Sequence, residues 1–189
     1  MSETRKTMAT ALLVVLAIAA FAAAAITLTN ITQWTVQAQT APIVKVAGPD
    51  AVNSSYILTS IHAGTASDGT NRTYITITGF RGDPTKYDNV LKICNKDTIA
   101  SYSVQLVYRG IIGTSSWNNY VKYLKFWINN QGPLQVDAST TSGSATPAVT
   151  VSANSCVPVS VEVLVDGSLP DSMLGQPLIT VEIDVVSSH

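Results

Sequence analysis

Charged side chains are scarce in this sequence. Lys, Arg, Asp and Glu make up 12% of its 189 residues, about half the usual share, and the net charge is only -1. Proteins that bind nucleic acid or an anionic membrane surface carry clusters of Lys and Arg, and the chain has no such cluster. We therefore do not expect nucleic acid or a membrane surface as a partner.

Histidine is scarcer still, with only His62 and the last residue, His189. A Ser-His-Asp triad would have to use His62, and the Gly-x-Ser-x-Gly turn and the glycine-rich phosphate loop are both absent. Two carboxylates could still meet in space for glycoside hydrolysis. Most of the available acids fall in expected turns or on outer strand faces: Asp83, Asp88, Glu162, Asp166, Asp171, Glu182 and Asp184. We predict that the protein is not an enzyme, with a secreted hydrolase as an alternative.

Cysteine occurs twice, as Cys94 and Cys156. One pair in an exported chain predicts one disulfide, with two buried free thiols as the alternative. Histidine and cysteine do not cluster as a zinc site requires. Oxygen ligands in the turns at Ser67–Asn71 and Gly82–Asp88 would suit calcium, but neither segment has the spacing of a known calcium loop. We therefore expect no cofactor, with calcium as an alternative.

Residues 1–25 are typical of a secretory signal peptide. Arg5 and Lys6 precede an uncharged apolar run, which ends in alanines that suit signal peptidase. About 17 apolar residues at ~1.5 Å each span roughly 26 Å, slightly less than a ~30 Å bilayer core. A retained anchor and a type IV pilin-like leader cut before Thr7 are the alternatives. We predict a secreted protein, extracellular or on the cell surface, that meets the membrane only during export.

Residues 26–40 follow the leader directly and alternate in polarity. The polar side chains at odd positions are mostly Thr and Gln. The apolar side chains fall at even positions: Ile26, Leu28, Trp34, Val36 and Ala38. Such alternation predicts a half-buried β-strand.

Residues 41–189 read as one β-rich domain. Ser and Thr together supply 41 residues of the chain, and Val and Ile are plentiful between them. Short alternating runs recur between turns that contain Gly, Pro, Asn and Asp. This pattern predicts an all-β, jelly-roll-like β-sandwich.

Two segments within this domain need separate predictions. Residues 117–128 have apolar side chains at both helical and strand spacing, and we favour a strand that turns at Asn129–Gly132 into a partner strand. Residues Asp137–Ala148 lack apolar anchors, and this absence predicts an exposed loop.

Three sequons for N-glycosylation begin at Asn30, Asn53 and Asn71. Asn53 and Asn71 lie near expected turns, where a glycan is harmless, so both are candidate sites. Asn30 lies on the apolar even face of residues 26–40, where a glycan would prevent burial. We therefore discount Asn30.

The chain resembles the archaeal bundling pilins and the related TasA/camelysin biofilm fibre proteins. The resemblance lies in the leader ending in alanines, the alternating strand behind it, and the Ser/Thr-rich all-β body. "YDNVLKICN" (Tyr87–Asn95) is similar to the core strands of that group. Archaeal cannula-type subunits look similar too, and would add calcium at the subunit contacts.

The resemblance implies a subunit that polymerises with copies of itself by donor-strand complementation, with Ile26–Gln39 as the donor strand. It also implies that neighbouring filaments bundle. A strand at the end of a chain can complete a neighbour's sheet or its own. The expected function is therefore a structural subunit of an extracellular filament, and the alternative is a secreted adhesin or binding module that completes its own sandwich.

Overall fold

The computed structural model describes residues 35–53, 57–65, 71–112, 117 and 119–189. The chain divides into two compact units, residues 1–39 and residues 40–189. In the first unit, residues 35–39 are exposed and have no regular secondary structure. The predicted leader and most of the predicted donor strand lie outside the described residues.

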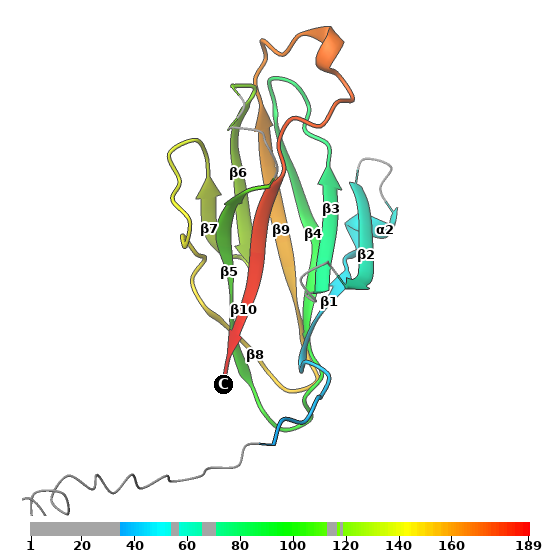
Figure 1. The fold of residues 1–189 in the computed structure, drawn as a ribbon. Coiled ribbons are helices and arrows are strands. Elements are labelled where there is room, and N and C mark those ends of the chain that lie inside the picture. Colours follow the sequence, from blue (N-terminus) through cyan, green and yellow to red (C-terminus); the bar gives the residue numbers. More distant parts are fainter. Residues whose placement is uncertain (1–34, 54–56, 66–70, 113–116, 118) are drawn as a thin grey trace, which may run out of the picture. The chain divides into compact units, whose positions relative to one another are not determined.

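The larger sheet of the second unit has five antiparallel strands (Figure 1). From one edge to the other they are β1 (Ile43–Ala47), β4 (Pro84–Asn95), β9 (Cys156–Val165), β6 (Val121–Ile128) and β7 (Gln131–Val136).

The smaller sheet has three antiparallel strands, in the order β10 (Val181–Ser188), β5 (Tyr102–Ile111) and β8 (Val149–Val151). A separate hairpin pairs β2 (Ile57–Thr65) with β3 (Asn71–Ile77). The helical elements among the described residues are short: α2 (Pro49–Asn53) and a 3-10 turn, η1 (Asp171–Met173).

The two sheets pack face to face over a core of aliphatic side chains. Along β9, the buried valines fall at every second position from Val157 to Val165, as expected for a strand with one face in the core. In the centre of the core they meet β5 residues such as Val104 and Leu106, which are almost fully buried. The all-β prediction is confirmed, whereas the jelly-roll connectivity stays a prediction.

The ambiguous segment forms strand β6 and turns into β7, as we favoured. Asn129 and Asn130 both have positive φ, at 49° and 61°. Asparagine tolerates this conformation better than most residues, and two such residues make the tight turn whose twist matches a hairpin.

Helix α2 was not predicted, because the sequence Gly48-Pro49-Asp50 is typical of a turn. The N–H of Gly48 donates to the Val90 carbonyl at 3.0 Å, and the Asp50 carboxylate accepts the N–H of Asn89 at 2.8 Å. A Cβ at Gly48 would lie 1.8 Å from the Asn89 carbonyl oxygen. Glycine therefore lets the chain leave β1 in close contact with β4.

Cys94 and Cys156 form a disulfide, as predicted, with a sequence separation of 62. They are direct register partners across the β4–β9 ladder. Cys94 is also the partner of Val44 on β1. The bond therefore fixes the ladder next to the point where the chain joins the larger sheet.

Candidate functional site

One open side of the sandwich is closed by the chain itself. This is the side between β7 and β8, where residues 137–148 connect the two sheets. The N–H of Tyr108 donates to the Ser144 carbonyl and the N–H of Gly143 to the Tyr108 carbonyl, both at 2.8 Å. The N–H of Thr146 donates to the Leu106 carbonyl at 2.9 Å. The connection therefore continues the hydrogen bonding of β5 beyond the short strand β8.

The same connection is better anchored than the sequence suggested. Thr146 is buried, and its Oγ1 accepts the N–H of Leu106 at 3.0 Å. At the start of the loop, hydrogen bonds from the Ser139 hydroxyl, the Gln135 amide and the Ser139 N–H lower the pKa of Asp137 to about 2. The prediction of an exposed loop holds for most of its residues, but the loop does have anchors, and they are polar.

The opposite side of the sandwich, between β1 and β10, is not closed in this way. Among the residues that the structure describes, no strand pairs with the outer edge of β1 or β10. Natural proteins blunt exposed edges with proline, charge or short strands. Edge strand β7 carries Pro133, and β8 has three residues. β10 carries Glu182 and Asp184 and a register shift between Glu182 and Ile183, but it has eight residues and no proline, so it offers a longer edge for pairing than β7 or β8.

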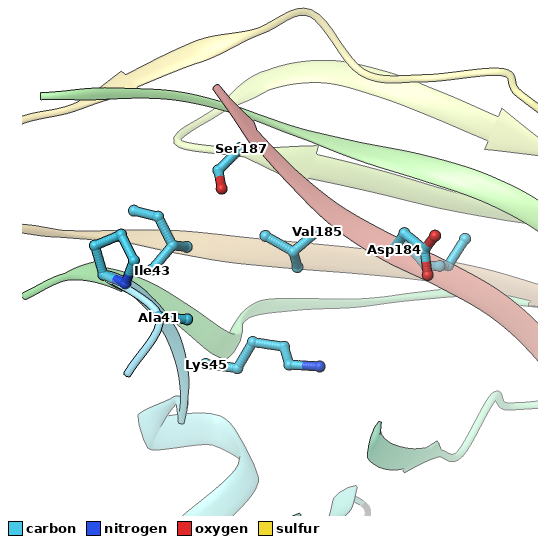
Figure 2. Close-up of a pocket in the computed structure, with 8 residues that line it drawn as sticks. Ala41, Ile43, Lys45, Asp184, Val185 and Ser187 are labelled. Atoms are coloured by element: carbon cyan, nitrogen blue, oxygen red, sulfur yellow. The ribbon is translucent and has the colours of Figure 1, made fainter. Parts of the chain in front are cut away.

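A groove of about 300 Å³ lies between these two strands (Figure 2). One wall comes from the start of β1 and the two residues before it, and the other from β10. The lining residues are Ala41, Pro42, Ile43, Lys45, Ile183, Asp184, Val185 and Ser187. Ile43, Ile183 and Val185 are half-buried and pack against the main core cluster. The groove is thus a place where the apolar core reaches the surface.

Charge is placed at the margins of this groove. Lys45 and Asp184 come from its opposite walls (Figure 2). Burial lowers the pKa of Lys45, and the negative charge of Asp184 opposes that shift. Asp184 also accepts a hydrogen bond from Arg109 Nε at 2.6 Å. A lysine facing inward at an edge strand discourages unselective strand pairing.

The predicted donor residues are described only in part. Val36 is 94% exposed and Ala38 is exposed, whereas Ile26, Leu28 and Trp34 lie outside the described residues. Residues 35–40 form no strand within this chain.

The structure describes the backbone positions of two candidate glycosylation sites, Asn53 and Asn71. Asn53 is the last residue of α2, and Asn71 is the first residue of β3. Both therefore lie at the ends of elements, near the turns that the sequence indicated. Asn30 lies outside the described residues.

Most of the carboxylates that we considered for catalysis are held in ion pairs. Asp171 accepts from Arg81 at 2.7 Å, and Asp88 pairs with Lys86 at 2.9 Å. Asp184 is paired as described above, and Asp166 pairs with Lys122.

Glu162 lies on the outer face of the larger sheet and has two partners. It accepts from Lys125 Nζ at 3.2 Å and from the Tyr123 hydroxyl at 2.9 Å. The pKa of Tyr123 is raised, first by burial and then by this hydrogen bond. These contacts all tie neighbouring strands together.

The candidate calcium segments do not form a ligand shell in the described residues. Strand β4 begins at Pro84, so most of Gly82–Asp88 is strand rather than turn, and Asp88 is paired with Lys86. Within the described ranges, no three His, Cys, Asp or Glu side chains lie close enough together to hold a metal ion. Of Ser67–Asn71, only Asn71 is described.

No protein-family model matches this chain, and the search of curated proteins found no match. The described part of the chain contains no helix that is long and apolar enough to span a membrane.

Sequence reasoning did not identify the groove residues. "VEIDVV" (Val181–Val186) alternates in polarity as a strand does, but nothing in it indicates a sheet edge. The one local signal is Lys45, a charge that shares a strand face with Ile43. The rest of the groove depends on which strands become neighbours.

Proposed function

We propose that this protein is a structural subunit of an extracellular filament, joined to its neighbours by donor-strand complementation. The observation that carries the proposal is the unpaired edge of β10 beside a groove where Ile43, Ile183 and Val185 reach the surface from the core. Residues 26–39 alternate in polarity, and the described part of this segment, residues 35–39, forms no strand. The proposed donor strand, Ile26–Gln39 of one subunit, lies in the β1–β10 groove of the next.

The chemistry of the two surfaces is complementary. Trp34, Val36 and Ala38 present apolar side chains at every second position. Ile183 and Val185 are spaced in the same way on β10 and line the groove. Burying four or five apolar side chains contributes on the order of 10 kcal/mol, and the backbone ladder adds several more. This sum can exceed an association cost of about 4–15 kcal/mol.

The ion pairs made by the acidic side chains favour a structural role. Two of their ion pairs, Lys125–Glu162 and Arg109–Asp184, join neighbouring strands of the same sheet. The disulfide is compatible with an extracellular location, because such bonds persist in oxidising compartments.

A second candidate is an adhesin or binding module in which residues 26–38 fill the groove of their own chain. The observation that favours it is the short connection Gln39–Pro42 before β1. A loop of about four residues is common in β-hairpins, so the segment could fold back along β1.

Deleting Ile26–Gln39 behind an intact leader tests the proposal against this alternative. A filament subunit should lose fibres in electron microscopy and remain a monomer with little change in thermal stability. A self-completed module should instead lose stability, because its own sheet would be incomplete. Fibres from the deleted chain would overturn the proposal.

Sequencing the mature N-terminus gives an independent check. A start at Ala23 or Ile26 leaves the donor strand free at the end of the chain, as the proposal requires. A start at Thr7 would instead support a type IV pilin-like subunit that keeps its apolar helix.

A further inference from the structure

We infer that the donor strand runs antiparallel to β10 and that adjacent subunits therefore contact each other end to end, with Ile99 of one subunit near Leu174 of the next. This inference rests on the proposed function and adds the direction of the strand and the surface that two copies share.

The strands define two opposite ends of the sandwich, which we call the base and the tip. The base contains Pro42, Lys96–Ala100 and His189: the N–H of Lys96 donates to the Pro42 carbonyl at 2.8 Å, and the His189 ring lies 5.4 Å from that of Tyr102. The tip contains η1. Arg81 forms a backbone bridge with Val165 at the end of β9, and its side chain pairs with Asp171 of η1, so η1 lies at that end of β9. Figure 1 shows η1 and the C-terminus at opposite ends of β10.

The connection between the donor strand and its own subunit is short. From Ala38 to Ile43 there are five residue steps, which span at most about 18 Å when fully extended. From Val181 to Ser188, β10 has seven residue steps and extends over about 23 Å. The base of the donating subunit must therefore lie at the acceptor's base or at its tip, and the direction of the donor strand decides which.

The two directions give different assemblies. β10 runs from tip to base, so a parallel donor would place Gln39 at the acceptor's base and bring two bases together. Two chains could then exchange strands reciprocally and close as a dimer.

An antiparallel donor places Gln39 beside Val181, at the tip. Each base then meets the next tip, and the assembly stays open, as a filament requires. All ladders between the described strands are antiparallel, and this pairing is also slightly more stable.

Each of the two ends presents an exposed apolar side chain on a braced loop. At the base, Ile99 is 90% exposed, and the Asp97 carboxylate accepts the N–H groups of Ile99 and Ala100 at 2.8 and 3.0 Å. At the tip, Leu174 is 54% exposed. Its loop is held by Arg81, which donates to the Leu169 carbonyl and to Asp171, both at 2.7 Å. Antiparallel insertion brings these two side chains to the same junction.

Cysteine cross-linking tests the end contact in the full, exported chain. The variant I99C/L174C should assemble into fibres and, on mild oxidation, give a ladder of covalent oligomers on a non-reducing gel. Gln135 is exposed on β7, opposite Lys125 of β6, and belongs to neither the base nor the tip, so Q135C/L174C is the matched control and should give no ladder. A dimer band from I99C alone would show base-to-base contact and overturn the inference.

A second pair of variants tests the direction of the donor strand, so that the inference can still be judged if I99C/L174C does not fold. A38C/V181C should cross-link between subunits, and A38C/S187C should not. The reverse pattern in fibres would overturn the inference while leaving donor-strand complementation intact. If the unmodified chain forms no fibres at all, the proposed function fails first.

Discussion

Cys94 and Cys156 face each other as register partners and are joined across two neighbouring strands of the same sheet. The β1 residue Val44 pairs with Cys94 on its other side. The disulfide therefore fastens the part of the larger sheet that forms one wall of the candidate groove.

Replacing both cysteines by serine should lower the free energy of unfolding by about 4 kcal/mol, because the bond closes a loop of about 60 residues in the unfolded chain. Urea denaturation of C94S/C156S beside the oxidised protein measures this. The double variant is the suitable comparison, since a single substitution leaves a reactive free thiol. An unchanged denaturation midpoint would contradict the expected role.

The even face of the donor strand should tolerate no charge. V36D places a carboxylate against the apolar side chains of the groove, such as Ile183 and Val185, and its desolvation should cost at least about 2 kcal/mol, or about 30-fold in the concentration needed for assembly. The isolated subunit should be as stable as before, because Val36 is 94% exposed there. Electron microscopy and thermal melts measure the two effects.

The neighbouring residue supplies the control for that substitution. Q37D adds the same charge on the odd face, which stays in solvent if the even face is buried. It should assemble nearly as well as the unmodified chain. Loss of fibres in Q37D but not in V36D would show that the opposite face of the strand is inserted.

Much of this architecture could be predicted from the sequence because it depends on local pattern. β6 and its hairpin with β7 follow from alternation and from two asparagines that accept positive φ. The disulfide follows from the number of cysteines. The helix α2 could not be predicted, since its position depends on contacts of Gly48 and Asp50 with β4, some 40 residues away in the chain.

The groove could not be predicted for a related reason. Whether "VEIDVV" becomes a central or an edge strand depends on the order of strands in the sheet, and the residues themselves alternate in either case. Likewise, the loop after Asp137 has no apolar anchor in its sequence, yet Thr146 fastens it to Leu106 through polar bonds. Such non-local hydrogen bonds leave no periodic signal.

Lys45 should restrain unselective association. K45M removes the half-buried ammonium from the groove wall, so the edge becomes more apolar and pairs more readily. A gain of about 1 kcal/mol would lower the concentration needed for self-association about five-fold. Light scattering and sedimentation measure this. Lys92, the register partner of Val46 on the other face of the sheet, gives the control K92M, which should change association little.

Acid should weaken the β7–β8 connection through Asp137. Its pKa is lowered to about 2 by hydrogen bonds from Ser139 and Gln135, compared with about 3.9 in an unfolded chain. A lowered pKa in the folded state stabilises the protein above about pH 4, and this contribution is lost as the pH falls through about 2. Urea midpoints measured from pH 5 to pH 2 should therefore fall less steeply in D137N. S139A should act in the same direction, and S142A, at an exposed position in the same loop, should not.

Gly48 should be the least replaceable residue at the end of β1. In G48A the new Cβ would lie 1.8 Å from the Asn89 carbonyl oxygen, a backbone atom that cannot move aside without disturbing β4. We expect a loss of about 3 kcal/mol or more in the free energy of unfolding. Gly167 has only the Cα of Gly82 near its Cβ position, at 3.8 Å, so G167A should cost far less. Because β1 forms a wall of the groove, G48A should also reduce fibre formation under conditions where the subunit is still folded. Equal stability of the two variants would show that the β1–β4 contact has room to relax.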